Sequence, residues 1–273
     1  MRTIVHLSDL HFGRVNHVTL QPLILAVAEI RPHLVAVSGD LTQRARVQQF
    51  KEARSFLDSL PSPLMVVPGN HDIPLDNLAL RLVRPLSRFK RYITSDLTPM
   101  HMDDEIAVLG LNTARRLLGK GGRINREQVS SIYELFSQLR GKQTRVIVTH
   151  HPFDLPEAFG KAYLLGRSQM AMESFAKCGV DLFLAGHLHV THSGDTARYK
   201  IENYSALVIQ AGTATSTRGR GELNSFNVIH IEPARISVET HAWQPECQRF
   251  SLSHAKHFRR STHGWQPSPP ETV

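Results

Sequence analysis

The sequence has little cysteine and no long apolar segment. Its two cysteines, Cys178 and Cys247, are too few for a disulfide framework, so we expect reduced side chains in the core or at the surface. No apolar stretch approaches the ~20 residues that a membrane-spanning helix needs. The opening MRTIVHLSDLH has neither a long apolar run nor a small-residue cleavage site, so no signal peptide is expected. These absences favour a cytoplasmic protein.

Acidic residues are also scarce relative to basic ones. The chain has 32 Lys and Arg against 24 Asp and Glu, which gives a net charge of +8. This balance favours anionic partners such as nucleotides, nucleic acid or acidic lipid headgroups, without choosing among them. With 273 residues, 41% of them hydrophobic, the chain can bury the core of one large α/β domain.

The first two thirds of the chain alternate between strand and helix patterns. Helical spacing of apolar residues predicts helices over residues 20–31, 46–60 and 125–141, with Asn125 as the N-cap of the last and Gly141 as its stop. Such alternation is typical of a mainly parallel sheet covered on both faces. The predicted strands cover residues 3–7, 34–37, 64–67, 106–111, 146–149 and 182–185.

The last third has strand composition without helices. Residues 204–212, 225–232 and 235–243 are predicted to be antiparallel strands that form a second sheet packed on the first. We expect the folded domain to cover residues 1–247. Residues 248–273 are basic and contain Pro and Ser, and we expect a tail that is disordered at its end.

Five predicted strands end in polar groups that bind metals or carry protons. Any one of these ends could be an ordinary turn, helix cap or interior histidine, but five in one chain are not explained that way. Residues two apart in an extended chain point the same way, so Asp-x-His and His-x-His can each reach one centre. Ligands gather at the C-terminal edge of open α/β sheets. The five ends are Asp9-Leu10-His11, Gly39-Asp40, Gly69-Asn70-His71-Asp72, His150-His151 and Gly186-His187-Leu188-His189.

The motifs SDLH, SGDLT, PGNHD, THHP and AGHLH resemble, in this order, those of the calcineurin-like metallophosphoesterase superfamily. The resemblance covers Val5 to His189 and is strongest to bacterial class III cyclic-nucleotide phosphodiesterases. It implies a four-layer α/β/β/α sandwich of two mixed sheets, with a dinuclear metal site at the C-terminal ends of the strands. By the same resemblance one metal is held by Asp9, His11, Asp40 and His189, and the other by Asp40, Asn70, His150 and His187.

The chemistry of this donor set agrees with that implication. Imidazole and carboxylate together suit Mn, Fe or Zn better than Mg or Ca. Two such ions lower the pKa of a water and neutralise phosphoryl oxygens during in-line displacement. By resemblance His71 is the general acid for the leaving group, although it could instead orient a ligand through a hydrogen bond. Asp72, His151 and His192 match no ligand position and are expected to play supporting roles or to lie at the surface.

The substrate is left open by the sequence. Cyclic nucleotides are the leading class of small phosphodiester. A lipid-linked pyrophosphatase, similar to UDP-diacylglucosamine hydrolases, is the first alternative, because the segment from Arg81 to Arg91 has five cations and no acid. That segment could dock on a membrane surface, form a lid over the site, or simply be a solvated basic helix. Basic residues at 114–126 and 218–220 keep a nuclease open, and a non-catalytic scaffold is the last alternative.

Overall fold

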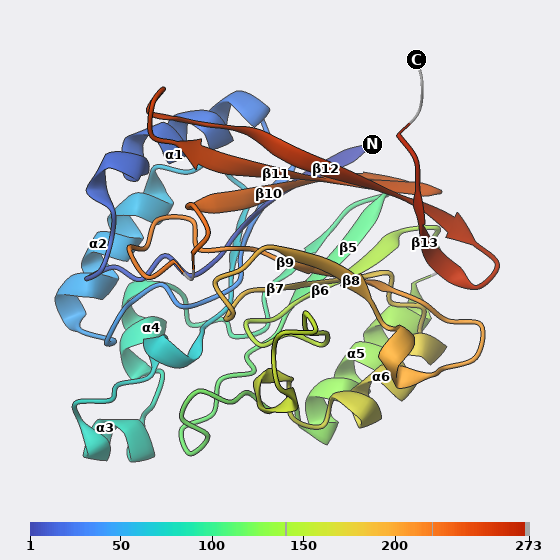
Figure 1. Cartoon of the computed structure of the whole chain (residues 1–273). Helices are drawn as coiled ribbons and strands as arrows, with labels where there is room; N and C mark the ends of the chain where they lie inside the picture. Colours follow the sequence, from blue (N-terminus) through green and yellow to red (C-terminus); the bar gives the residue numbers. More distant parts are fainter. Residues whose placement is uncertain (140, 220, 271–273) are drawn as a thin grey trace.

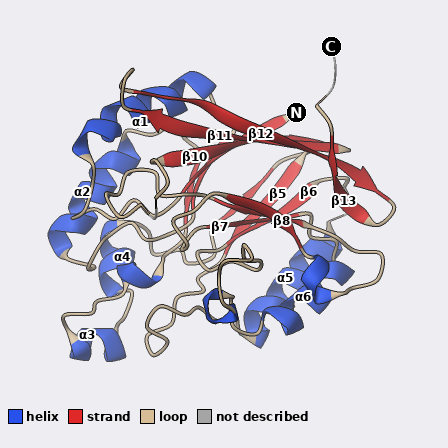
Figure 2. Ribbon diagram, in the orientation of Figure 1, coloured by secondary structure: helices blue, strands red, loops and turns tan. Residues whose placement is uncertain are grey.

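The computed structural model describes residues 1–139, 141–219 and 221–270, and within them the chain forms two mixed sheets (Figures 1 and 2). The seven-stranded sheet has the order β13-β12-β11-β10-β1-β2-β3, and the six-stranded sheet has the order β4-β5-β6-β7-β9-β8. The first sheet contains β1 (Arg2–Leu7), β2 (Leu34–Val37), β3 (Leu64–Val66), β10 (Ser225–Glu232), β11 (Arg235–Gln244), β12 (Arg249–Ser261) and β13 (Gly264–Ser268). The second contains β4 (Met100–Met102), β5 (Ile106–Gly110), β6 (Thr144–Val148), β7 (Leu182–Ala185), β8 (His192–Asp195) and β9 (Leu207–Gln210).

Helices cover the outer face of each sheet, which confirms the predicted four-layer sandwich. One hydrophobic cluster joins α1 (His17–Ile30), α2 (Val47–Asp58) and α4 (Ser87–Tyr92) to the seven-stranded sheet. A second lies between the two sheets, and a third joins α5 (Arg126–Gln138) and α6 (Ser168–Lys177) to the six-stranded sheet. Strand β1 shows the alternation that builds these layers, because Ile4 faces the other sheet and Val5 faces the helices.

The three predicted helices form close to their expected bounds. Helix α1 ends at Ile30, before Pro32, and α2 ends at Asp58, before Pro61. The Asn125 side chain caps α5 by accepting a hydrogen bond of 2.8 Å from the Gln128 backbone N–H. Helix α5 ends at Gln138, slightly earlier than the predicted stop at Gly141.

The allocation of strands to sheets differs from the prediction. The C-terminal strands do not form a sheet of their own, because β10 pairs antiparallel with β1 and so joins the sheet of β1, β2 and β3. Strand β9 instead runs parallel to β7 in the other sheet. The apolar runs in the sequence could not predict the pairing of these strands. Almost every residue is buried in β1, β2, β7 and β9, so the four runs look alike in the sequence.

The predicted tail is wrong for most of its length. Residues 249–268 form β12 and β13, and β12 pairs with β11 from Arg249 to Arg259. Phe258 and Trp265 are buried between the two sheets, so this hairpin completes the core. Basic and polar residues on its outer face concealed the strand pattern in the sequence. Residues 271–273, where disorder was predicted, lie outside the described part of the chain.

The basic segment (residues 81–91) forms two short helices instead of one. Helix α3 (Leu78–Val83) ends before Pro85, and α4 begins at Ser87. Arg81 is buried and donates to the Pro74 carbonyl, and Arg88 donates to the Ala45 carbonyl. These two cations therefore hold the segment in place rather than facing solvent. In the described residues no helix has the length and apolar character required to cross a membrane.

Candidate metal centre

The loops that follow β1, β2, β3, β6 and β7 converge on one cluster, so the metal-binding residues come from both sheets. Backbone hydrogen bonds connect these loops directly, from Asp9 N–H to the Gly39 carbonyl at 3.1 Å and from Gly186 N–H to the His150 carbonyl at 3.1 Å. The sequence predicted this convergence at the strand ends. It did not predict that two sheets would supply it.

The first half of the cluster contains the four residues predicted for one metal. Ligand atoms of Asp9, His11, Asp40 and His189 all lie within 4.8 Å of one another, and all four residues are buried. The Nε2 atoms of His11 and His189 are 3.0 Å apart, and His189 Nε2 is 3.1 Å from Asp9 Oδ1. The donor atoms therefore face a common point.

The second half contains the residues predicted for the other metal. His150 Nε2 lies 3.1 Å from Asn70 Oδ1, 3.3 Å from His187 Nδ1 and 3.4 Å from Asp40 Oδ2. Asp40 Oδ2 is also 3.7 Å from His11 Nε2, in the first half. Its other oxygen, Oδ1, accepts a 2.8 Å hydrogen bond from the His71 backbone N–H. One oxygen of Asp40 thus lies between the two groups, as a bridging ligand would.

The donor set fits divalent metals. Asp9 Oδ1 is buried and accepts no hydrogen bond among the described residues, while Asp9 Oδ2 accepts from Ser8 Oγ and the His187 N–H at 2.7 and 2.9 Å. A buried carboxylate oxygen without a donor is costly unless a cation or metal satisfies it. Imidazole nitrogens, carboxylate oxygens and one amide oxygen are donor types that divalent metal ions bind in proteins.

Five of the seven candidate ligands have a left-handed backbone. Their φ angles lie between 51° and 76°, a region of backbone conformation that residues other than Gly, Asn and Asp seldom adopt. Each such residue costs on the order of 1–3 kcal/mol and persists only where the surrounding structure enforces it. This strain is concentrated at the cluster and was not visible in the sequence. The five residues are Asp9, His11, Asp40, His187 and His189.

The glycines of the motifs serve two different purposes. Gly39 has a φ of +93°, as expected for the tight turn before Asp40. Gly69 and Gly186 are needed because neighbouring chain approaches them closely. A Cβ at Gly69 would lie 2.1 Å from Asp40 Oδ1, and a Cβ at Gly186 would lie 1.8 Å from Ser8 Oγ. The second purpose depends on contacts distant in sequence.

The carboxylates and histidines of the cluster shift one another's pKa values. Burial opposes charge on Asp9, yet the interactions with His189 and His11 lower the pKa of Asp9 well below its usual value. Burial also opposes charge on His150, but Asp40 beside it raises the pKa of His150 to about 9. At His187, burial and then the positive charge of His150 lower the pKa to about 3. The carboxylates are ionised, as ligands must be.

Asp72 and His151 support the cluster from behind. Asp72 accepts backbone N–H hydrogen bonds from Leu41, Thr42 and Gly69 at 2.9–3.2 Å, which ties the Asp40 and Asn70 loops together. Burial, and then the negative charge of Asp40, raise the pKa of Asp72 to about 7. His151 is buried and does not lie at the surface. Its Nδ1 and Nε2 are engaged by Thr113 Oγ1 at 2.8 Å and the Lys120 carbonyl at 3.1 Å, although a ring nitrogen of His151 also lies within 4.8 Å of ligand atoms of His150 and His187.

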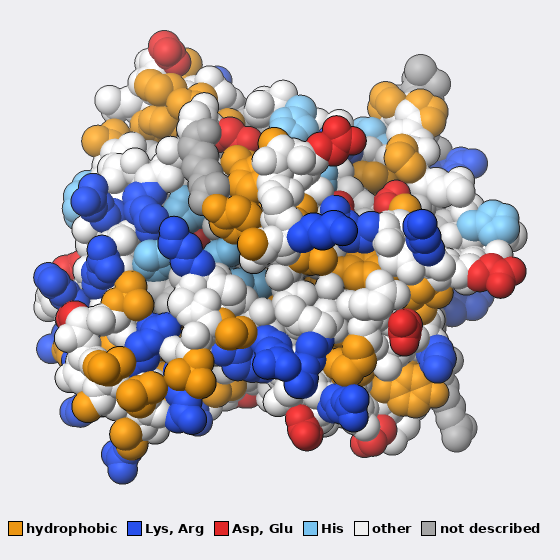
Figure 3. Space-filling model, turned by 60° about the horizontal axis from the view of Figure 1, so that its bottom comes forward, with side chains coloured by type: hydrophobic (Ala, Val, Ile, Leu, Met, Phe, Trp, Pro, Cys, Tyr) orange, Lys and Arg blue, Asp and Glu red, His pale blue; other side chains and the backbone are white. Residues whose placement is uncertain are grey.

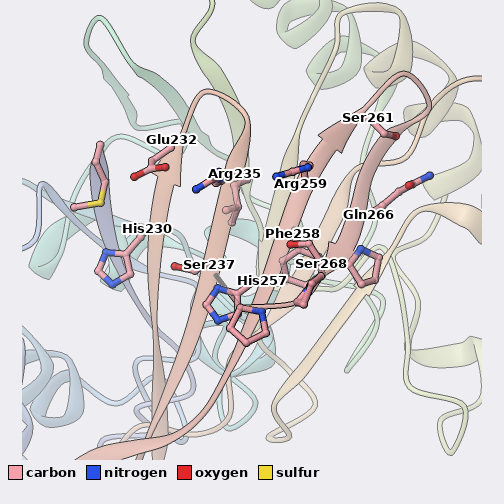
Figure 4. Close-up of a pocket in the computed structure, with 15 residues that line it drawn as sticks. His230, Glu232, Arg235, Ser237, His257, Phe258, Arg259, Ser261, Gln266 and Ser268 are labelled. Atoms are coloured by element: carbon pink, nitrogen blue, oxygen red, sulfur yellow. The ribbon is translucent and has the colours of Figure 1, made fainter. Parts of the chain in front are cut away.

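A sizeable cavity lies elsewhere in the molecule. It has a volume of about 940 Å³ and is lined by residues of β10–β13, including His230, Ser237, His257 and Arg259 (Figure 4). None of the seven candidate ligands lines it. A large cavity is the usual first guess for an active site, but here the donor atoms are a better guide than the volume.

Arg218, which the sequence places in a basic patch with Arg220, points into the site. That patch suggested a surface for nucleic acid. Arg218 Nη1 instead lies 3.3 Å from His71 Nε2, and the Arg218 carbonyl accepts a hydrogen bond of 3.0 Å from His189 Nδ1. The sequence carried no signal for this placement, because Arg218 lies far from every motif along the chain. Arg220 is outside the described residues.

Comparison with known proteins agrees with this geometry. The family model described as calcineurin-like phosphoesterase matches residues 2–191. The chain belongs to the calcineurin-like phosphoesterase family. This confirms the resemblance that its motifs indicated, and the matched region contains all seven candidate ligands and His71.

The curated proteins to which the chain is similar include phosphodiesterases. The chain is 30% identical over 169 residues to glycerophosphodiester phosphodiesterase GpdQ of Enterobacter lignolyticus, a match that covers 57% of this chain and 59% of that protein. It is 24% identical to a probable GpdQ of Arcobacter nitrofigilis, covering 89% of each chain. A probable cyclic nucleotide phosphodiesterase of Ruthia magnifica is 31% identical over 78 residues, which is 26% of this chain and 33% of the relative.

Solved structures share the fold. A purple acid phosphatase from yellow lupin superposes with a TM-score of 0.69 at 12% identity, covering 94% of this chain and 53% of that one. A dimetal phosphatase from Danio rerio gives a TM-score of 0.64 at 14% identity, covering 92% of this chain and 98% of that one. These identities support a common architecture and do not specify a substrate.

Proposed function

We propose that this calcineurin-like phosphoesterase is a metal-dependent phosphodiesterase that hydrolyses small phosphodiesters. The observation that carries the proposal is the position of Asp40 Oδ2 between two sets of buried donor atoms. Asp9, His11, Asp40 and His189 would hold one divalent ion, and Asp40, Asn70, His150 and His187 the other. Two ions bound there would supply an activated water and positive charge for the phosphoryl oxygens.

We propose that His71 protonates the leaving group. Its Nδ1 is 2.9 Å from the Gln43 carbonyl, which can only accept, so this nitrogen carries a proton and Nε2 is the atom left for the site. The His71 ring lies 5.0 Å from the His11 ring, centroid to centroid. These contacts support the role predicted for His71, with Nε2 as the atom that would donate the proton.

Replacing His71 should affect substrates according to their leaving groups. For His71→Ala we expect turnover of cyclic AMP to fall by roughly 10²- to 10³-fold, because an alkoxide needs a proton to leave. Turnover of bis-nitrophenyl phosphate should fall far less, because nitrophenolate leaves unaided. Steady-state kinetics with both substrates on the metal-loaded variant would test this. Equal losses on both, together with less bound metal, would instead indicate that His71 only orients a ligand.

The names of the relatives support a proposal for the class of substrate. Relatives named for glycerophosphodiesters match up to 89% of this chain, while those named for cyclic nucleotides match 26%. We therefore propose small diesters of both types as candidate substrates, with cyclic nucleotides the class that the motifs first suggested. A nuclease has less support, because Arg115 and Arg116 of its basic stretch donate to carbonyl oxygens within the protein.

A second candidate, an amphiphilic substrate, is favoured by exposed apolar residues beside the basic segment. Leu78 and Val83 of α3 are 67% and 74% exposed, and Leu117 on a neighbouring loop is 73% exposed. Arg116 joins that loop to α3 through the Leu82 carbonyl. Figure 3 shows apolar and Lys/Arg side chains mixed on this face of the molecule. A lipid-linked pyrophosphate at a membrane surface would match both, with the protein otherwise cytoplasmic.

A panel of substrates would separate these candidates. Protein reconstituted with Mn²⁺ would be assayed against bis-nitrophenyl phosphate, cyclic AMP, glycerophosphocholine, UDP-diacylglucosamine and single-stranded DNA. We expect hydrolysis of the first and of at least one small diester. Preference for UDP-diacylglucosamine would favour the amphiphilic candidate, and preference for DNA would favour a nuclease. Hydrolysis of none of them, with two metals bound per chain, would overturn the proposed function in favour of a scaffold.

A further inference from the structure

A loop between β9 and β10 places an arginine over the metal centre. The loop is fixed by several contacts, including Arg218 N–H to Ser216 Oγ at 3.1 Å and Asn224 Nδ2 to the Ser216 carbonyl at 2.9 Å. The Arg218 carbonyl also accepts from His189 Nδ1. Since Nδ1 donates there, Nε2 of His189 is the nitrogen that faces the metal cluster. The backbone of Arg218 is thereby held at one side of the cluster.

The Arg218 side chain extends from there to His71 on the other side. Its Nη1 is 3.3 Å from His71 Nε2 and 3.3 Å from Gln43 Oε1, and the residue is half-buried. Neither partner is an acid: Gln43 offers its amide oxygen, and His71 offers Nε2, because its Nδ1 donates to the Gln43 carbonyl. Within the described part of the chain no carboxylate forms an ion pair with this guanidinium. The positive charge of Arg218 therefore lies beside the site without a carboxylate to neutralise it among the described residues.

A guanidinium in this position is suited to an anion. Its planar N–H groups match the oxygens of a phosphate, and such charge-assisted bonds are about twice as strong as those to neutral acceptors. A phosphate ester bound beside His71 would therefore be a better partner for Nη1 than the imidazole is. Exchange of one for the other would also free His71 Nε2, which would take up a proton from solvent before donating it to the leaving group.

We infer that Arg218, held by Gln43, forms a subsite for a non-bridging oxygen of the substrate phosphoryl group. This inference rests on the proposed function and adds to it a third source of positive charge, supplied by the chain itself. The contact with His71 is then the resting arrangement. When substrate binds, the hydrogen bond from Arg218 Nη1 to His71 Nε2 is replaced by one from Nη1 to the phosphoryl oxygen.

The test compares Arg218→Ala and Arg218→Lys with Arg259→Ala, all loaded with Mn²⁺. Arg259 is exposed on β12 and serves as the matched control. We expect kcat/KM for bis-nitrophenyl phosphate to fall roughly 10- to 150-fold in Arg218→Ala, as loss of a hydrogen bond to a charged group predicts. Arg218→Lys should recover part of the loss, and added guanidinium should raise the rate of Arg218→Ala only. Arg259→Ala should stay within about twofold of the unaltered protein.

Two further measurements distinguish a phosphate subsite from a purely structural role of Arg218. Affinity for inorganic phosphate, measured by calorimetry on the metal-loaded proteins, should fall in Arg218→Ala while the metal content stays at the unaltered level. Unchanged phosphate affinity would overturn the subsite. Loss of metal would overturn it too, by showing that the residue acts through His189. Failure of the unaltered protein to hydrolyse any diester would instead overturn the proposed function, while the phosphate titration would still test the subsite.

Discussion

Asp40→Ala should abolish phosphodiester hydrolysis, with turnover falling by roughly 10³-fold or more. Replacing a residue that only orients a metal ligand costs 10- to 100-fold in activity, whereas we propose that Asp40 binds both ions directly. The substitution removes Oδ2 from between His11 and His150, and it also removes Oδ1, the acceptor for the His71 N–H. Turnover of bis-nitrophenyl phosphate and metal content by elemental analysis would be measured together.

The same variant should respond less to metal in thermal unfolding. Ligands that bind only the native state raise Tm, so Mn²⁺ should stabilise the unaltered protein and stabilise Asp40→Ala much less. Asp58→Ala is a suitable control, because Asp58 is exposed on α2 and pairs only with Arg54 within the described chain. It should keep its activity, its metal and its response to Mn²⁺. Near-full activity in Asp40→Ala would be incompatible with a bridging role.

Gly69→Ala should inactivate the enzyme almost as completely, although it changes no ligand. The added methyl group would lie 2.1 Å from Asp40 Oδ1 and 2.3 Å from Asp40 N, so the backbone of one loop must move. Gly69 has a φ of −100°, which alanine adopts freely, so the obstacle is space alone. A displacement near 1 Å at a catalytic centre can cost about 10²-fold in rate. Overpacking should also lower the free energy of unfolding by about 1–3 kcal/mol.

Gly160→Ala provides the matched glycine substitution. Gly160 precedes a short turn, has a φ of −71°, and has no atom within 4 Å of the position a Cβ would take. The turnover of the Gly160→Ala variant should stay within about twofold of the unaltered protein, and the midpoint of its unfolding in urea should hardly change. If Gly69→Ala and Gly160→Ala proved equally active, the close packing of the Asp40 and Asn70 loops would not be needed for catalysis.

The sequence was informative about the site because the signals there are local. Asp-x-His after β1 and His-x-His after β7 are complete within three residues, and each follows a strand that is recognisable by its apolar run. The common direction of parallel strands explains why ligands gather at one edge within each sheet, but β1 and β7 belong to different sheets, so the meeting of their two motifs depends on how the sheets pack. The supporting contacts were not predictable in this way. The Asp72 carboxylate, for example, joins Leu41 and Thr42 to Gly69 across about 30 residues of sequence.

The predictions from sequence were wrong where they relied on the composition of a segment and not on its contacts with other segments. Residues 249–268 are rich in basic and polar groups, and that composition suggested a tail. Yet Phe258 and Trp265 close the core between the sheets once β12 has paired with β11. The composition of the basic segment similarly suggested one solvated helix, although Arg81 and Arg88 donate to backbone carbonyls of other loops. In both cases specific contacts, which composition does not reveal, decide which residues are buried.

By itself, then, the sequence determined the residue types of the site, their order along the chain and the superfamily, because spacing within a motif is a property of a few consecutive residues. Only the tertiary structure decided that two sheets share the ligands, that five of them take a left-handed backbone, and that Arg218 lies against His71. These features arise from contacts between segments tens to hundreds of residues apart. No local pattern encodes such contacts, since they form only when the whole core packs.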